Sequence, residues 1–285
     1  MKQIIVPVDF SEESTNGIDL ALLLSSRTGS DIQLVYVQKK IPEHFSGSEN
    51  EQKKIANKYF DQLRDKYEKK LTTGVNFDFI IKTGKVYKEV VNQAEAFEDS
   101  AIVVSTHGAS GFEQLFIGSN AFRIITATKK PVFTIRYGVL PADIRRIILP
   151  IDITEQSRQK VPLTMELAKL FNSEIHILTV SSTKSNDIAQ KLKAYSNQVA
   201  EYMNEQNIPF VQASRTGPNI TDTAIEYCVE NKGDLMSIMT EQGTSITNIF
   251  LGSYAHQMLN KAPVPVMAIT PKELRLPGGF STSGG

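Results

Sequence analysis

Short apolar runs alternate with longer amphipathic segments along the first half of the chain. The runs are rich in Val, Ile and Phe, and they lie at residues 3–8, 32–38, 77–82, 101–105 and 132–136. Short continuous runs of this kind are typical of parallel strands that are buried on both faces. The amphipathic segments have helical spacing and lie at residues 12–28, 50–71, 86–98 and 119–129. Strands that alternate with helices predict a parallel sheet covered by helices.

The second half of the chain repeats this plan. Its apolar runs lie at residues 146–151, 174–180, 209–214, 234–239 and 265–269. Helix-like segments separate them, at residues 155–171, 185–206, 219–231 and 253–261. The pattern therefore predicts two α/β domains of similar design, because each half contains its own complete set of strands and helices.

Sequence landmarks recur in the two halves in the same order. Residues 6–14 (VPVDFSEES) return as residues 149–157 (LPIDITEQS), and residues 116–119 (FIGS) return as residues 250–253 (FLGS). Gly and Pro interrupt the pattern at residues 137–142, where we place the seam. Matches that stay in register over both halves indicate a duplication.

Length and composition agree with two domains. The chain has 285 residues, of which 41% are hydrophobic, and this is enough for each half to bury a core of its own. We expect a first domain at residues 1–138, a second domain at residues 143–272 and a flexible tail at residues 273–285.

The charge balance argues against nucleic acid and membranes as partners. Lys plus Arg and Asp plus Glu each number 31, so no surplus of charge attracts a polyanion or an anionic bilayer. The N-terminal apolar run is too short for a signal peptide, and no segment approaches membrane-spanning length. The single cysteine, Cys228, fits a reducing compartment. We expect a cytoplasmic protein.

Neither a metal site nor a catalytic residue is predicted. The four histidines are scattered, without an HxxxH pair or a Cys/His cluster. His107 lies in a loop where it could contact a ligand, but no acidic partner or nucleophile accompanies it, so a packing role is favoured.

Three features should meet at one edge of the first predicted sheet, because parallel strands place their carboxyl ends together. Asp9 directly follows the first strand, and its carboxylate can accept from a base amino group or a ribose hydroxyl. Val37 ends the second strand, where its backbone can bind an adenine edge. Ser105 ends the fourth strand and opens a loop that leads to the start of a helix.

That loop has the chemistry of an anion cradle. Gly108 and Gly118 let the backbone approach a ligand closely, and Ser119 and Asn120 add donors at the helix start. Free amides and the helix dipole favour negative charge there. The alternative is that both glycines only shape turns.

These motifs resemble those of the universal stress protein family. The family loop reads Gly, two residues, Gly, nine residues, then Gly-Ser or Gly-Thr, after an early strand that ends in Asp. Gly108, the nine residues 109–117 and Gly118-Ser119 match it, whereas Ser105 replaces the first Gly. The resemblance spans residues 1–137 and 144–270.

The resemblance implies two tandem adenine-nucleotide-hydrolase-like (Rossmann-like) domains, each a five-stranded parallel sheet flanked by helices. It implies ATP, with or without Mg²⁺, as the cofactor. Asp9 and Val37 would lie near adenine or ribose, and Ser105, Gly108, Gly118, Ser119 and Asn120 near phosphate. It also implies that the fifth strands, at residues 131–136 and 264–269, pair as an intramolecular pseudo-dimer, and it leaves open a homodimer.

The second loop departs from this pattern. Met239 and Gln242 stand where the family has glycines, and Glu241 would bring negative charge toward a phosphate. We therefore expect its counterparts of the first site to be relics or structural residues. These are Asp152, Val180, Gly252 and Ser253. Gly243, one position late, leaves a shifted loop open.

Three functions fit the sequence. The first is an ATP-binding stress-response regulator that holds its nucleotide in domain 1 with little or no turnover and acts on an unknown protein partner. The second is a nucleotide-free interaction scaffold with both loops vestigial, which the Ser105 replacement and the altered second loop motivate. The third is an enzyme, which ranks lowest because no activating base, metal-ligand set or nucleophile has a recognisable spacing.

Overall fold

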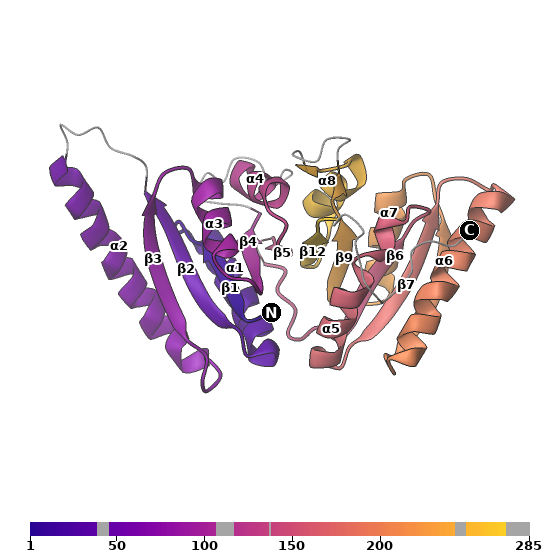
Figure 1. The fold of residues 1–285 in the computed structure, drawn as a ribbon, viewed down its shortest axis with the longest axis horizontal. Helices are drawn as coiled ribbons and strands as arrows, with labels where there is room; N and C mark the ends of the chain where they lie inside the picture. The colour runs from indigo at the N-terminus through magenta and orange to yellow at the C-terminus, as the bar shows by residue number, and fades with distance from the viewer. Residues whose placement is uncertain (39–45, 107–116, 137, 243–248, 272–285) are drawn as a thin grey trace. The chain divides into compact units, whose positions relative to one another are not determined.

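In the computed structural model the chain divides into two α/β units, Met1–Leu140 and Pro141–Gly285 (Figure 1). The structure describes residues 1–38, 46–106, 117–136, 138–242 and 249–271. The tail expected at residues 273–285 lies outside this described part. Each unit has a sheet and helices of its own, as the repeated pattern predicts.

The first unit contains a parallel sheet in the order β3-β2-β1-β4-β5. Its strands are β1 (Gln3–Pro7), β2 (Asp31–Gln38), β3 (Phe77–Thr83), β4 (Ser100–Ser105) and β5 (Val132–Ile135). The chain moves outward from β1 to β3 and then returns to pair β4 with the other side of β1. Strand order therefore reverses between β1 and β4. The chain segments that follow these two strands run in opposite directions, and a gap opens between them at the carboxyl ends of the strands.

Helices pack against this sheet along their apolar sides. They are α1 (Glu12–Thr28), α2 (Ser46–Tyr67), α3 (Val86–Glu95) and α4 (Ser119–Ala127), and a 3-10 turn, η2 (Glu68–Lys70), extends α2. Helix α1 packs on β1 and β4, and α3 packs on β1 and β2. The core side chains of the central strands, such as Ile4, Ile5 and Ile102, are fully buried, which is why these runs contain no polar alternation.

Helix α1 begins at a side-chain cap. The Ser11 hydroxyl accepts a hydrogen bond from the Ser14 amide at 3.1 Å, and Glu12 and Glu13 lie in the first turn, where negative charge suits the helix dipole. The helix ends at Gly29, whose φ of 66° is left-handed. This helix start lies shortly after the end of β1, with the Ser11 cap two residues after Asp9.

The second unit has the same topology. Its sheet order is β12-β9-β6-β7-β8. The strands are β6 (Arg146–Ile151), β7 (Glu174–Ser181), β8 (Phe210–Thr216), β9 (Leu235–Met239) and β12 (Val266–Ile269). The helices are α5 (Val161–Phe171), α6 (Asn186–Glu205), α7 (Ile220–Glu230) and α8 (Ser253–Lys261). Strand order reverses between β6 and β9.

Two local features of the second unit differ from the sequence expectation. The single helix expected at residues 155–171 is divided into a 3-10 turn, η3 (Gln156–Arg158), and α5, and Pro162 at the first turn of α5 fits a new helix start there. A short antiparallel ribbon, β10 (Glu241–Gln242) with β11 (Ile249–Phe250), was not predicted. The division of the helix places Lys160 immediately before α5.

Replacing the cap serine of α1 should destabilise the first unit. Ser11→Ala removes the acceptor for the Ser14 amide, and loss of such a cap costs about 1 kcal/mol. Urea unfolding followed by the circular dichroism and aromatic fluorescence of the full chain measures the change. Ser26→Ala, on the exposed side of the same helix, is the matched control and should leave the midpoint nearly unchanged. Equal effects of the two substitutions would contradict the assigned cap.

Candidate functional site

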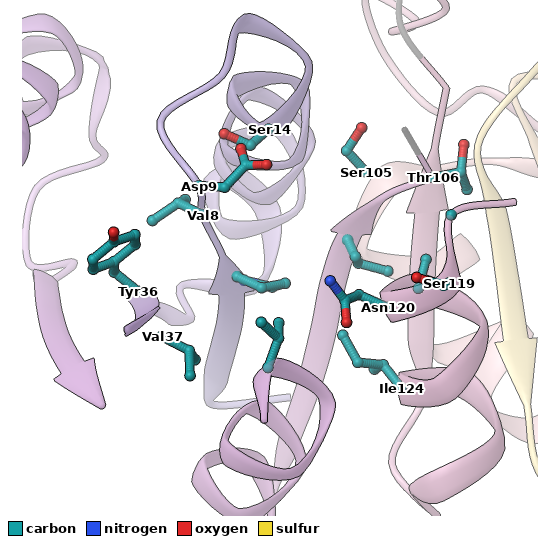
Figure 2. A pocket seen from close by; sticks show the side chains of 15 residues that line it. Val8, Asp9, Ser14, Tyr36, Val37, Ser105, Thr106, Ser119, Asn120 and Ile124 are labelled. Atoms are coloured by element: carbon teal, nitrogen blue, oxygen red, sulfur yellow. The ribbon is translucent and has the colours of Figure 1, made fainter. Parts of the chain in front are cut away.

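A pocket of about 380 Å³ opens at the carboxyl ends of β1 and β4 in the first unit (Figure 2). It lies at the reversal of strand order, where open parallel sheets bind ligands. Its lining comes from the loop after β1, the end of β2, the start of α3, the end of β4 and the first turns of α4. The lining residues are Pro7, Val8, Asp9, Ser14, Tyr36, Val37, Val86, Val104, Ser105, Thr106, Gly118, Ser119, Asn120, Ala121 and Ile124.

The structure brings the predicted site residues together in this pocket. Asp9 and Val37 lie on the side of β1 and β2, and Ser105 lies at the end of β4. Gly118, Ser119 and Asn120 form the start of α4. Gly108 was also predicted here, but Gly108 and the neighbouring His107 lie outside the described residues.

Asp9 is held at the pocket mouth by the cap of α1. Its Oδ1 accepts hydrogen bonds from the Ser11 amide at 3.1 Å and from the Ser11 hydroxyl at 2.6 Å. Next to it, Phe10 adopts a φ of 65°, a left-handed conformation that is rare for a bulky residue. The Phe10 ring packs 4.7 Å from the Tyr36 ring and 4.9 Å from the Tyr59 ring, between centroids. These contacts fix the turn that presents the Asp9 carboxylate.

The backbone of Val37 faces the gap beyond the end of β1. Pairing between β1 and β2 ends at Pro7 and Val35, and the last bond runs from the Val8 amide to the Val35 carbonyl at 3.0 Å. Backbone groups two residues apart on a strand point toward the same neighbour. The amide and carbonyl of Val37 therefore point to the side where β1 has already ended, and they can bind the edge of a planar base.

Gly118 connects the end of β4 to the start of α4 through a close backbone contact. Its amide donates to the Thr106 carbonyl at 2.6 Å, and a Cβ at this position would lie only 2.9 Å from that oxygen. Its φ of −56° is open to any residue, so this position requires glycine for space rather than for conformation. Any side chain here must push the two segments apart.

The first turn of α4 presents hydrogen-bond donors to the pocket. No side chain of the described residues caps this helix, and Ser119 and Asn120 are exposed on its first turn. Figure 2 shows the Asn120 amide reaching into the pocket from the α4 side, while Asp9 reaches in from the β1 side. The site thus has an acceptor at one side and donors with the positive end of a helix at the other.

Several lining residues were missed by sequence reasoning. Tyr36 forms part of the wall beside Val37, Thr106 extends the lining beyond Ser105, and Ser14 and Ile124 come from two helices. Tyr36 and Thr106 are neighbours of predicted residues, so the ends of their strands were the available signal. The two helical residues gave none, because a helix residue reaches the pocket only through the way its helix packs on the sheet.

The second unit has a pocket of similar size, about 360 Å³, at the reversal between β6 and β9. Its lining residues are Pro150, Ile151, Asp152, Lys160, Val180, Ser182, Pro218, Asn219, Ile220, Thr221, Met239, Ser253, Tyr254 and Gln257. Asp152 repeats the arrangement of Asp9, because its Oδ1 accepts from the Thr154 amide at 2.7 Å and from the Thr154 hydroxyl at 2.5 Å. Both units therefore keep a pocket at the same topological position.

Two buried groups distinguish the second pocket from the first. Lys160 is only 3% exposed, and burial lowers its pKa from 10.5 to about 8 although Asp152 favours the charged form. Burial also raises the pKa of Tyr254, and the Asp152 charge adds to that effect. Neither side chain has a counterpart of its type at the matching position of the first pocket, where Gly17 and Asn120 stand.

Metal ligands do not gather in the described part of the chain, where no group of three or more His, Cys, Asp or Glu side chains could hold an ion. Among the same residues, no helix is both long and apolar enough to cross a membrane. The chemistry of the first pocket thus comes from one carboxylate, backbone groups, small polar side chains and a helix start.

A parallel sheet covered by helices, with a pocket at its strand-order reversal, defines an α/β protein with a Rossmann-like fold. The model of the universal stress protein family matches residues 1–136 and 143–270. The chain belongs to this family and contains two of its domains in tandem. The universal stress protein YxiE of Bacillus subtilis is 26% identical over 148 residues, which cover 47% of this chain and 98% of that protein.

Solved structures share the fold over most of the chain. A universal stress protein from Archaeoglobus fulgidus aligns with a TM-score of 0.76 and 18% identity, over 94% of this chain and 98% of its own. A functionally unknown protein from Pseudomonas aeruginosa aligns with a TM-score of 0.67 and 14% identity, over 95% of this chain and 93% of its own. At these identities the likeness concerns the fold.

Replacing Lys160 should stabilise the protein at neutral pH. Below about pH 8 the Lys160 ammonium is charged in both the folded and the unfolded chain, and burying this charge lowers the free energy of unfolding. Between about pH 8 and pH 10.5 the unfolded chain binds more protons, so stability rises with pH. A pKa lowered from 10.5 to about 8 corresponds to a loss of about 3 kcal/mol in the free energy of unfolding when the lysine is charged.

We expect Lys160→Met to raise the free energy of unfolding of the second unit by about 3 kcal/mol at pH 7, and most of this difference from wild type to disappear near pH 10.5. Urea titrations of both proteins across this pH range measure it. Lys169→Met removes an exposed lysine from α5 and should show no such pH dependence. A difference that stays constant with pH would refute a buried charge at Lys160.

Proposed function

We propose that the first domain binds ATP in the pocket between β1 and β4 and that the protein is a nucleotide-dependent stress-response regulator. The observation that carries this proposal is the convergence of Asp9, the Val37 backbone and the start of α4 on one pocket. The carboxylate and the helix start lie on different elements, which suits a ligand with a base and sugar at one end and phosphates at the other.

The base and the ribose belong on the β1 and β2 side of the pocket. The unpaired amide and carbonyl of Val37 can receive the N1 and the 6-amino group of adenine. The Asp9 carboxylate, fixed by Ser11, is an acceptor for ribose hydroxyls. Tyr36 adds an aromatic wall beside them.

The phosphates belong at the start of α4. Its first turn, which no side chain of the described residues caps, offers donors on Ser119 and Asn120 and the positive end of the helix dipole. Ser105 adds a hydroxyl at the end of β4. Mg²⁺ would enter on the phosphate oxygens, since the described residues provide no cluster of ligands for it.

A regulatory role fits this pocket better than catalysis. The lining contains one carboxylate, Asp9, and no His, Cys or Lys among the described residues, so it supplies no separate base and acid pair for turnover. Bound ATP would place its own charge and surface between the fixed turn at Asp9 and the start of α4, and a protein partner can respond to that change.

ATP should stabilise the full chain against heat. A ligand that binds only the folded state at 100 times its Kd adds about 2.7 kcal/mol, and the effect should concern the first domain. Differential scanning fluorimetry with and without millimolar ATP and Mg²⁺ measures it. Gly118→Asp should abolish the rise, because its side chain collides with the Thr106 carbonyl and carries negative charge toward the phosphates.

Gly252→Asp provides the matched control, since Gly252 holds the corresponding position before α8 in the second domain. This variant should keep the ATP-dependent rise. Absence of any rise in the wild-type chain, together with no nucleotide released from the denatured protein, would overturn the proposal and favour the nucleotide-free scaffold.

The Val37 backbone should discriminate ATP from GTP. Guanine presents an acceptor where adenine presents its 6-amino donor, and a donor at N1 where adenine presents an acceptor. The guanine N1–H would then face the Val37 amide donor, and the guanine O6 would face the Val37 carbonyl. GTP should therefore bind at least about tenfold more weakly than ATP. Isothermal titration calorimetry with both nucleotides measures the ratio. Equal affinities would show that the base is not bound by this strand edge.

A further inference from the structure

Lys160 is a largely buried lysine for which the described residues provide no ion-pair partner. The residue is 3% exposed and lines the second pocket. Across the described residues, its side-chain ammonium makes no hydrogen bond and no ion pair, although its carbonyl accepts from Thr164. Asp152 interacts with it electrostatically but without a direct contact. Enclosing most of a charged side chain with incomplete compensation is costly, so an anionic group from outside the chain would stabilise this position.

The position of Lys160 places it at the anion end of the pocket. Lys160 follows Asp152 by eight residues, as Gly17 follows Asp9 in the first domain. A Cβ on Gly17 would lie 3.5 Å from the Ser105 amide, at the end of β4. The matching place in the second domain is the end of β9, which is where Met239 lines the pocket. The lysine side chain thus starts near the strand end that corresponds to Ser105 of the first domain.

A second unpartnered group lies in the same pocket and comes from another element. The Tyr254 hydroxyl, on α8, is buried and has no hydrogen-bond partner among the described residues. Like Lys160, it interacts electrostatically with Asp152. A buried hydroxyl without a hydrogen bond lowers the stability of the fold, and a hydrogen bond to a ligand oxygen would recover that free energy. Two hydrogen-bond donors are therefore available to one acceptor of a ligand: the ammonium of Lys160, before α5, and the hydroxyl of Tyr254, on α8.

The rest of the pocket defines the remainder of the ligand. Apolar walls come from the strand ends and from the loop before α7, through Ile151, Val180, Pro218, Ile220 and Met239. The volume of about 360 Å³ lies in the range of small-molecule sites. A ligand that fits has an apolar body and an oxyanion that faces the two donors.

We propose that the second domain binds a small organic oxyanion, a phosphate monoester or a carboxylate, through Lys160 and Tyr254. The lysine charge adds to the start of α8, which no side chain of the described residues caps, as none caps the start of α4 in the first domain. Glu241 and Met239, which disfavour the family's phosphate loop, then mark a changed ligand rather than a lost site. The proposal is independent of ATP binding in the first domain, because it rests on side chains that this domain lacks.

Phenyl phosphate and benzoate are suitable probes, since each joins an apolar ring to an oxyanion, and phenol is the neutral control. The readout is the ¹³Cε signal of Lys160 in the full chain labelled with ¹³C-lysine, assigned by its loss in Lys160→Met. We expect a saturable shift with at least one of the two anions and none with phenol. We also expect the titration midpoint of this signal to move to higher pH when the anion is bound.

Tyr254→Phe should weaken the response about tenfold, as expected for loss of one hydrogen bond to a charged group. The Lys169 signal, from an exposed lysine, should not saturate. A response to phenyl phosphate alone identifies a phosphate ligand, and a response to benzoate alone identifies a carboxylate. The proposal is overturned if neither anion gives a saturable shift at Lys160, if phenol acts equally, or if Tyr254→Phe binds as wild type does.

Discussion

The reversal of strand order in each sheet is the constraint on which the rest of the structure depends. Once β4 returns to pair with β1, the connections from these strands must leave in opposite directions. The loop after β1 and the start of α4 are then held apart, and a pocket follows at the carboxyl edge. The Ser11 cap and the contact between Gly118 and Thr106 fix the two sides of this pocket, so local bonds stabilise what the topology creates.

The duplication applies this constraint twice with different chemistry. The turn at Asp9 is repeated at Asp152, with a hydroxyl residue two positions later holding each carboxylate. The two pockets differ in their polar side chains: among the described residues no side chain caps the helix start in either domain, and the second domain adds the largely buried Lys160. Both domains thus keep a pocket at the reversal of strand order, with different side chains in its lining.

Most of the fold and part of the site follow from the sequence in physical terms. The spacing and type of the apolar residues predict strands such as β4, because a strand buried on both faces consists mainly of apolar residues. Asp9 and Val37 were predictable as residues at strand ends. Lys160 was not, because a helix was expected to run through its position and its burial depends on how η3 and α5 pack. Asp152, Val180, Gly252 and Ser253 were expected to be relics or structural residues, an expectation in which Lys160 played no part.

Hydrogen–deuterium exchange of the full chain with and without ATP and Mg²⁺ tests the central claim most directly, because it locates binding along the sequence. The account predicts slower exchange at residues 8–14, 36–38 and 117–122, which surround the first pocket. It predicts little change at residues 151–157 and 252–257 around the second. Protection confined to the second domain, or absent from both despite saturating ATP, would contradict the account.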